Sequence, residues 1–202
     1  MRAVILVGGK GKRLMPLTQN IRKAYLPLGN KRVVDHIIDR LPKGISFSIS
    51  ENDSGAMAAI SEALTGEEPV MVICGDNYFG ESLDGFVQTF TRNTLIGIYD
   101  IEDKEKAKKY GVVETYPSGR IRRFYEKPEK PNSTLVSTGI YIFPPVLYQG
   151  IKQFARLSPD INLGDLINQL NQYHPVHSYL FEGVWFDIGS HESYQEALKV
   201  VE

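Results

Sequence analysis

Short apolar runs alternate with helical periodicity along the first part of this chain. Ala3–Val7 and Val70–Cys74 are continuous apolar runs, which is typical of strands buried on both faces. Ser46–Ser50 alternates polar and apolar residues and predicts a further strand. Val33–Leu41 has apolar residues at helical spacing, and a second helix is expected over Ser54–Leu64, capped by its first residue. A β-α-β-α-β order of this kind predicts a parallel sheet with helices on both faces.

The middle of the chain has a different pattern, rich in β-branched and aromatic residues. Gly111–Tyr116 and Arg120–Tyr125 flank the turn sequence Pro117-Ser118-Gly119, and Leu135–Phe143 follows. These three segments predict an antiparallel addition to the parallel sheet. The remaining expected elements are helices at Leu83–Phe90, Val146–Phe154, Leu163–Asn171 and Ser190–Val201, and strands at Leu95–Tyr99 and Val176–Phe181.

The 202 residues suffice for one domain with a sizeable core. The chain has 23 Lys and Arg against 24 Asp and Glu, and this net charge of −1 argues against binding to nucleic acid or an anionic membrane. The single cysteine, Cys74, cannot form an internal disulfide, as expected in a reducing cytosol. The apolar run near the N-terminus is too short for a signal peptide or a membrane span. We therefore expect a soluble cytoplasmic protein.

A glycine-rich loop, Gly8-Gly9-Lys10-Gly11, directly follows the first predicted strand. Glycines at such a position let backbone N–H groups approach a phosphate closely. Residues 2–30 contain six Lys or Arg and no Asp or Glu, which favours a polyanion site. The loop is not a P-loop, because Arg13 stands where Ser or Thr is needed, and Leu14 replaces the third glycine of a dinucleotide fingerprint. A solvated turn with incidental charge is the alternative.

Two aspartates follow apolar, strand-like runs at widely separated places in the chain. Asp76 comes after Gly75 at the end of the run Val70–Cys74, and Asp187 comes after Trp185-Phe186. Ligands bind at the carboxyl ends of strands in open α/β sheets, and carboxylate oxygens suit Mg²⁺. The two carboxylates are therefore candidate ligands of one ion. The alternatives are a turn or helix cap for Asp76 and an N-cap for Asp187.

Two further segments carry candidate ligand-binding residues. Glu126-Lys127-Pro128 ends a predicted strand, and the compact charge of Lys127 suits a phosphate monoester. Gly139 interrupts the predicted strand Leu135–Phe143, which leaves room for a ligand beside the backbone. The alternatives are an exposed hairpin end for the first segment and a simple β-bulge for the second.

Taken in order, these segments resemble the sugar-phosphate nucleotidylyltransferase family, and are most similar to the catalytic domains of glucose-1-phosphate thymidylyltransferases and uridylyltransferases. The likeness covers nearly the whole chain. It implies a Rossmann-like, GT-A-like nucleotide-diphospho-sugar transferase fold of the α/β class, with a mixed, mostly parallel central sheet. The matching segments are Leu6–Thr18, Lys23, Leu26–Leu28, Gly75–Asn77, Tyr110–Val113, Glu126–Pro128, Ser137–Tyr141 and Trp185–Gly189.

The resemblance implies which residues act on the nucleotide. Arg13 would stabilise charge on the α-phosphate and the departing pyrophosphate, and Lys23 would contact the same phosphates. Together with Asp76, these are the implied catalytic residues. The implied nucleotide-binding residues lie around the phosphates and the base, and are Leu6, Gly8, Gly9, Gly11, Gly55 and Gly75.

The same resemblance assigns the metal and the second substrate. Asp76 and Asp187 would bind Mg²⁺, the implied cofactor. Lys127 would hold the sugar phosphate, and Glu126 and Gly139 would contact sugar hydroxyls. The implied reaction is Mg²⁺-dependent transfer of a nucleotidyl group from an NTP, with dTTP or UTP favoured, to a sugar 1-phosphate, which gives an NDP-sugar and pyrophosphate.

The sequence departs from the family pattern in several places. Arg22 stands where a Pro usually precedes the lysine, Lys12 replaces a Thr before the loop arginine, and Ser50 occupies the position of a base-reading Gln. About one βα unit is missing at residues 41–44. The C-terminal elements of many relatives are also absent, so we expect residues 1–202 to be a single, shortened catalytic domain.

These departures leave a second interpretation open, in which the same fold binds a nucleotide or sugar nucleotide as a regulatory module without turnover. In both interpretations the expected partners are small molecules, an NTP and a sugar 1-phosphate, rather than nucleic acid or a membrane. The sequence leaves the question of a homodimer open.

Overall fold

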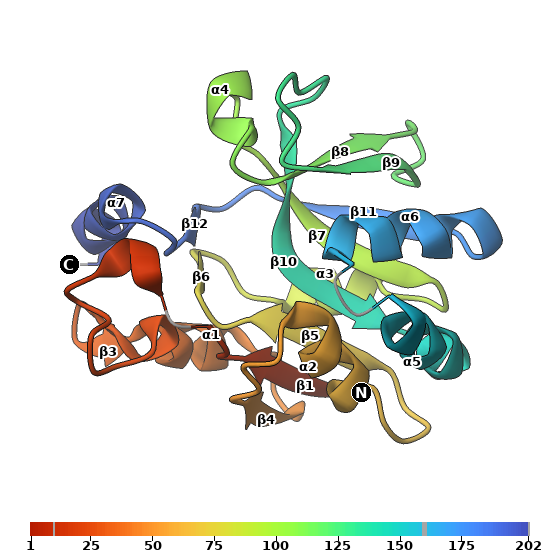
Figure 1. Cartoon of the computed structure of the whole chain (residues 1–202), viewed down its shortest axis with the longest axis horizontal. Helices are drawn as coiled ribbons and strands as arrows, with labels where there is room; N and C mark the ends of the chain where they lie inside the picture. The colour runs from red at the N-terminus through yellow and green to blue at the C-terminus, as the bar shows by residue number, and fades with distance from the viewer. Residues whose placement is uncertain (10, 159–160, 202) are drawn as a thin grey trace.

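The computed structural model describes residues 1–9, 11–158 and 161–201, and its centre is one eight-stranded sheet (Figure 1). Six strands lie in the order β11-β7-β10-β5-β1-β4, and the hairpin of β8 and β9 joins them through β10. The strands of this sheet are β1 (Arg2–Leu6), β4 (Ser46–Ser50), β5 (Val70–Cys74), β7 (Thr94–Asp100), β8 (Gly111–Thr115), β9 (Ile121–Glu126), β10 (Leu135–Phe143) and β11 (Val176–Phe181). Along the six-strand order only β10 runs against the others, so the expected mixed, mostly parallel sheet is confirmed.

The first half of the sheet is parallel because helices return the chain between its strands. β1 pairs with β4 on one side and with β5 on the other, so that Leu6 lies beside both Ser50 and Cys74. The helices α1 (Val33–Arg40) and α2 (Ala56–Ala63) make the two crossovers and cover opposite faces of the sheet. Three strands therefore finish together at one edge, where ligands bind in open α/β sheets.

β10 runs antiparallel between β5 and β7. Gly139 lies in the middle of this strand with a φ of 76°, and the register against β7 shifts between Ser137 and Tyr141. The hairpin of β8 and β9 attaches to the same strand, and its turn is closed by the Tyr116 N–H, which donates to the Arg120 carbonyl at 2.8 Å. The expected antiparallel addition is confirmed, with a bulge at Gly139.

A separate antiparallel ribbon lies between the sheet and the C-terminal helix. It consists of β6 (Asn77–Phe79) and β12 (Trp185–Asp187), with Asp187 opposite Asn77 in the register. The sequence patterns did not predict this pairing, because strands of three residues show too little periodicity.

Helices cover both faces of the central sheet, and a third apolar cluster flanks it. α2 lies with α5 (Tyr148–Leu157) and α6 (Leu163–Tyr173) on one face, and α1 lies with α3 (Asp84–Thr89) on the other. α7 (His191–Val201) packs in the third cluster against the N-terminal segment. Within the described ranges, no helix has both the length and the apolar character needed to cross a membrane. The remaining elements are β2 (Pro27–Leu28), β3 (Lys31–Arg32), α4 (Lys104–Ala107) and the 3-10 helices η1 (Lys12–Leu14), η2 (Lys23–Tyr25) and η3 (Pro145–Leu147).

The start of α2 differs from the expectation that Ser54 caps it. Gly55 is the N-cap residue, with a φ of 103°, and no side chain at that position accepts a hydrogen bond from the first turn. The Ser54 N–H instead donates to the side-chain oxygen of Asn52 at 2.7 Å. Glycine adopts this backbone conformation without steric cost, so backbone geometry rather than a hydroxyl cap begins α2.

Candidate active site

The glycine-rich loop after β1 begins beside the end of β5. The Gly75 N–H donates to the Leu6 carbonyl at 2.8 Å, and a Cβ on Gly75 would lie 2.9 Å from the same oxygen. It would also lie 2.8 Å from a methyl carbon of Val7, so only glycine fits where β5 ends. This close approach brings Asp76, the next residue, to the start of the loop.

Asp76 and Asp187 lie together although they are far apart in the sequence. The antiparallel ribbon brings the end of β12 alongside the start of β6, and the Ile188 N–H donates to the Asp76 carbonyl at 2.7 Å. Burial and then the negative charge of Asp76 raise the pKa of Asp187 to about 6. Asp187 does not cap a helix, because α7 begins only at His191. Asp76 lies in the turn between β5 and β6.

Three basic side chains act on this pair of carboxylates. Lys23, at the start of η2, forms an ion pair with Asp76. Lys23, Arg13 and Lys127 all oppose the rise in the Asp187 pKa through their positive charge. The structure therefore brings together two acidic and three basic residues that the sequence pattern singled out.

The glycines of the loop have distinct surroundings. Gly9 has a φ of 99°, and no described atom lies within 4 Å of a Cβ built there. Gly11 has a φ of 55° and lies against Thr18. The Thr18 hydroxyl donates to the Gly11 carbonyl at 2.8 Å and holds the end of the loop. A Cβ on Gly8 would lie 2.3 Å from the Asn52 carbonyl oxygen, so this glycine permits close backbone contact. Lys10 lies outside the described residues.

Asp53 is a site residue that the sequence pattern did not identify. Its carboxylate accepts a hydrogen bond from the Gly9 N–H at 3.0 Å and two from the Arg22 guanidinium, at 2.6 and 3.1 Å. The Asp53 carboxylate thus already accepts a hydrogen bond from Gly9 N–H, a loop N–H group of the kind that binds phosphate. The signal that could have found it is the acidic character of residues 51–53, which directly follow a strand ending at this edge. Gly55, two residues further on, faces open space.

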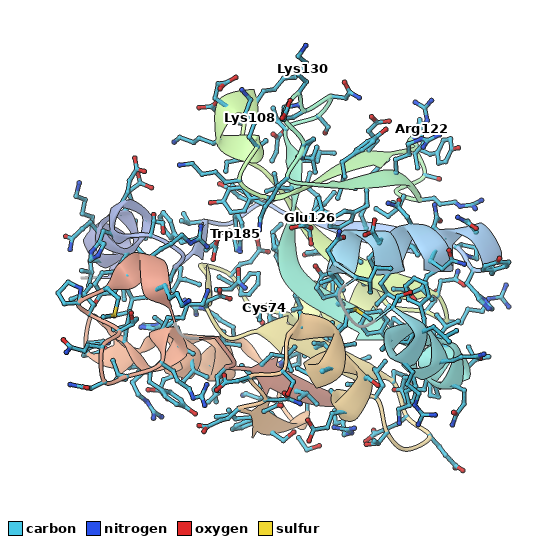
Figure 2. All side chains as sticks on the ribbon, viewed as in Figure 1. Cys74, Lys108, Arg122, Glu126, Lys130 and Trp185 are labelled. Carbon is cyan, nitrogen blue, oxygen red and sulfur yellow. The ribbon has the colours of Figure 1, made fainter. Side chains whose placement is uncertain are left out.

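A pocket of about 310 Å³ opens beside the two aspartates. Figure 2 shows Cys74, Glu126 and Trp185, three of its lining residues, around the centre of the molecule between β6, β10 and β12. Glu126 and Gly139, two predicted sugar-binding residues, line it together with Asp76 and Asp187. The pocket is of a size that accommodates small ligands.

Asn77 organises the wall of this pocket. Its side chain donates to the Cys74 carbonyl at 2.9 Å and accepts the indole N–H of Trp185 at 2.8 Å. A Cβ on Gly139 would lie 3.1 Å from the Asn77 amide nitrogen. The sequence pattern missed Asn77, because an amide that acts through packing and hydrogen bonds leaves no motif.

Lys127 lies at the end of β9, outside the enclosed part of the pocket. Its side chain is 62% exposed, and its Nζ lies 3.6 Å from a Glu126 carboxylate oxygen. Its φ of 45° is rare for a residue with a side chain. Such backbone strain is concentrated at functional sites.

The nucleotidyl transferase family model matches residues 2–49 and 45–202, which together span nearly the whole chain. The two stretches overlap at residues 45–49. The low-salt glycan biosynthesis nucleotidyltransferase Agl11 of Haloferax volcanii is 24% identical over 238 aligned residues. That alignment includes all of this chain but only 66% of the length of the relative.

Solved structures share the fold. A Bacillus anthracis protein that carries the name glucose-1-phosphate thymidylyltransferase, crystallised with sucrose, has a TM-score of 0.88 at 24% identity, covering 100% of this chain and 95% of that one. A UDP-glucose pyrophosphorylase complexed with UDP-glucose has a TM-score of 0.77 at 21% identity, covering 98% and 97%. The UDP-glucose pyrophosphorylase of Acinetobacter baumannii has a TM-score of 0.79 at 18% identity, covering 98% and 91%. The family match, which spans both halves of the sheet and both aspartates, shows that this chain belongs to the nucleotidyl transferase family.

Proposed function

We propose that this chain transfers a nucleotidyl group from an NTP, dTTP or UTP, to a sugar 1-phosphate and releases pyrophosphate. One observation supports the proposal most strongly. Asp76 and Asp187 lie together at the carboxyl edge of the sheet, Lys23 forms an ion pair with Asp76, and the charges of Lys23 and Arg13 act on Asp187. Clustered acidic and basic groups at this edge suit a triphosphate with its divalent cation.

The donor set fits Mg²⁺ held by Asp76 and Asp187. Burial and mutual repulsion raise the pKa of Asp187, and a divalent cation would relieve that repulsion. Within the described ranges no group of three or more His, Cys, Asp or Glu could hold a metal. A site with two carboxylates suits Mg²⁺, which completes its shell with water and substrate phosphates. When bound, Mg²⁺ would supply neutralisation of phosphate charge.

The reaction depends on positioning and charge neutralisation rather than on a general base. An oxygen of the sugar 1-phosphate, already ionised at neutral pH, attacks the α-phosphorus, and the bond to pyrophosphate breaks as the new P–O bond forms. Lys23 would contact the α-phosphate, and Arg13 would meet the charge that grows on the pyrophosphate. The N–H groups of Gly8, Gly9 and Gly11 would bind the remaining phosphate oxygens.

The pocket beside the aspartates would take the sugar. Glu126 would accept hydrogen bonds from sugar hydroxyls, and Gly139 would let the ring lie close to the backbone. Lys127, at the mouth of the pocket, would hold the phosphate monoester. The base would lie against Gly55, near Leu6 and Gly75 at the strand ends, with Ser50 at the position that reads it. We further propose that residues 1–202 act as a shortened, cytoplasmic catalytic domain, in keeping with a free and half-buried Cys74.

The proposal is tested by pyrophosphate release with a panel of NTPs and hexose 1-phosphates in the presence of Mg²⁺. Asp76→Asn and Asp187→Asn should each lower kcat/KM by on the order of 10²–10³-fold. Asp39→Asn is a matched control, because Asp39 is exposed on α1 and pairs with Lys31 rather than with a residue of the site. Failure of the wild-type protein to turn over any pair, or full activity of Asp76→Asn, contradicts the proposal.

A second function has a specific observation in its favour. The Asp53 carboxylate lies on the Gly9 N–H, where a phosphate would bind in an active enzyme. A module that binds nucleotide or sugar nucleotide without turnover would tolerate this arrangement. Calorimetric binding of an NDP-sugar with no pyrophosphate release from any substrate pair would favour this second function.

A further inference from the structure

One edge of the central sheet is bare. β4 ends the strand order beyond β1, and Figure 1 shows it at the outer edge of the sheet. Residues 46–49 are exposed, and Ser50 is half-buried. In the described part of the chain β4 pairs with β1 alone. A strand edge of this kind carries unpaired N–H and C=O groups and is a template for another strand.

The opposite edge of the same sheet is partly closed. β11 forms that edge, and its Ser178 N–H donates to the Gly119 carbonyl at 2.8 Å. Arg120 forms an isolated bridge with His177. The turn between β8 and β9 therefore occupies hydrogen-bonding positions along β11. Of the two ends of the six-strand order, β4 is therefore the one open to a partner.

The peptide groups of β4 that face outward belong to Phe47 and Ile49. The Val7 N–H donates to the Ser50 carbonyl at 2.8 Å, so the peptide groups of Ser50 point toward β1. Because alternate residues of a strand direct their N–H and C=O groups to opposite sides, the intervening Phe47 and Ile49 direct theirs to the free edge. Their side chains are also exposed, by 46% and 37%.

We propose that the partner is a second copy of this chain, whose β4 pairs antiparallel with the first about a two-fold axis at Ser48. The segment Ser-Phe-Ser-Ile-Ser has the same order of polar and apolar residues in both directions. In this register Phe47 lies opposite Ile49 of the partner subunit, and Ile49 lies opposite its Phe47. These are hydrogen-bonded pairs, so the outward peptide groups exchange their bonds. The four apolar side chains lie on one face and cover one another.

The charges at the ends of β4 support this orientation. Lys43 precedes the strand, and Glu51 and Asp53 follow it. An antiparallel pair places the end of each β4 that follows Lys43 near the end of the other β4 that precedes Glu51 and Asp53. The basic end of β4 in each subunit therefore lies near the acidic end of β4 in the other. Because the two-fold axis relates the two subunits, this attraction occurs at both ends of the strand pair. The pairing would also steady residues 51–53, which continue from β4 to the loop at Gly8 and Gly9.

Sedimentation velocity over a range of protein concentrations tests the association. The wild-type chain should approach twice its 22.7 kDa as concentration rises. The double variant Phe47→Lys/Ile49→Lys places lysines opposite each other and should weaken association at least tenfold. Leu180→Lys is the matched control, because Leu180 is also 46% exposed but lies on β11. A wild-type chain that stays monomeric, or equal association of both variants, overturns the proposal.

Disulfide trapping tests the register and does not depend on the folding of the lysine variant. Ser48 would lie directly opposite Ser48 of the partner subunit in a non-hydrogen-bonded pair, whose Cα separation of about 4.5 Å suits a disulfide. Ser48→Cys should therefore form a covalent dimer under mild oxidation. Ser46→Cys, on the same strand and face, would lie opposite Ser50 and should form little. Equal trapping of the two variants, or none with Ser48→Cys, contradicts this pairing.

Discussion

The Lys23 ammonium group and the Asp76 carboxylate form an ion pair in which the two side chains are only 19% and 18% exposed. Burial by itself lowers the pKa of Lys23, but the charge of Asp76 and the hydrogen bond between them outweigh this effect and leave it raised. Lys23 thus neutralises part of the charge that Asp76 and Asp187 concentrate at the strand ends. A metal ion would compete for Asp76, and a phosphate would compete for Lys23.

Replacement of Lys23 should make the protein depend on Mg²⁺ for stability. Lys23→Gln leaves the Asp76 carboxylate buried without its cation, which should cost about 3 kcal/mol in the metal-free protein. Because Mg²⁺ would replace the lost charge, its addition should raise the Tm of this variant more than that of the wild type. Thermal unfolding in EDTA and in Mg²⁺ measures both effects.

Lys31→Gln provides the control for this experiment. The ion pair of Lys31 with Asp39 is about half-exposed, so its loss should cost less than about 1 kcal/mol and should not respond to Mg²⁺. An equal Mg²⁺ response in the Lys23 variant and the wild type would show that the cation does not bind beside Asp76.

Removal of the Asp187 charge should stabilise the metal-free protein above pH 6. The pKa of Asp187 is about 6 in the folded protein against an ordinary value of 3.8, so the folded state retains the proton more strongly. Its stabilising contribution is present below about pH 4 and is lost as the pH rises to 6. Asp187→Asn avoids that loss. Its free energy of unfolding at pH 7.5 should therefore exceed that of the wild type by about 1–3 kcal/mol.

Denaturant unfolding in EDTA across pH 4 to 8 is the appropriate measurement for Asp187→Asn. The advantage of the variant should shrink toward zero at pH 4, where the wild-type carboxyl is protonated. A constant difference across this range would mean that Asp187 does not titrate as described.

Removal of the Asp53 side chain should tighten nucleotide binding. In the wild type the Asp53 carboxylate accepts the Gly9 N–H and pairs with Arg22, both of which suit a phosphate. Asp53→Ala removes this internal anion, and the dissociation constant of an NTP should fall about fivefold, the equivalent of one hydrogen bond. Isothermal titration calorimetry with Glu51→Ala as the control separates the Gly9 contact from the loss of a charge near Arg22, because the Glu51 carboxylate accepts the Tyr25 hydroxyl and lies 3.8 Å from the Arg22 Nε. Weaker binding by Asp53→Ala would show that Asp53 supports the loop rather than competing with phosphate.

Crowding at Gly139 should impair sugar-phosphate binding selectively. Gly139→Ala places a Cβ 3.1 Å from the Asn77 amide nitrogen and from the Cys74 Cβ. Because Asn77 also holds Trp185, the wall of the pocket must shift, and the KM for sugar 1-phosphate should rise by about tenfold, or ~1.4 kcal/mol. The KM for the NTP should change little.

Gly44→Ala is the matched control for Gly139→Ala. Gly44 also has a positive φ, 85°, but no atom lies within 4 Å of a Cβ built there. Both variants carry the backbone strain of a left-handed residue, about 1–2 kcal/mol, and only Gly139→Ala carries the crowding. If the two variants change the KM for sugar 1-phosphate alike, the contact with Asn77 is not responsible.

Local patterns predicted the longer strands of the central sheet. Val70–Cys74 coincides with β5, because a strand buried on both faces is apolar at most positions. The predicted ranges Leu135–Phe143 and Val176–Phe181 likewise coincide with β10 and β11. The cap of α2 was predicted wrongly, because a serine near a helix start resembles an N-cap whether or not its hydroxyl is used. The β6–β12 ribbon was not predicted, because its strands are short and pair across a long stretch of sequence.

The sequence by itself determined the strands of the central sheet, the helical crossovers and the glycines that end β1 and β5, since these depend on residues that are neighbours along the chain. Only the tertiary structure decided which charges meet: Lys23 with Asp76, and Asp53 with the Gly9 N–H. It also decided that β4, an ordinary alternating strand in the sequence, is left at a bare edge. Ion pairs and hydrogen bonds depend on distance through space, and those distances arise only when segments far apart in the chain pack together.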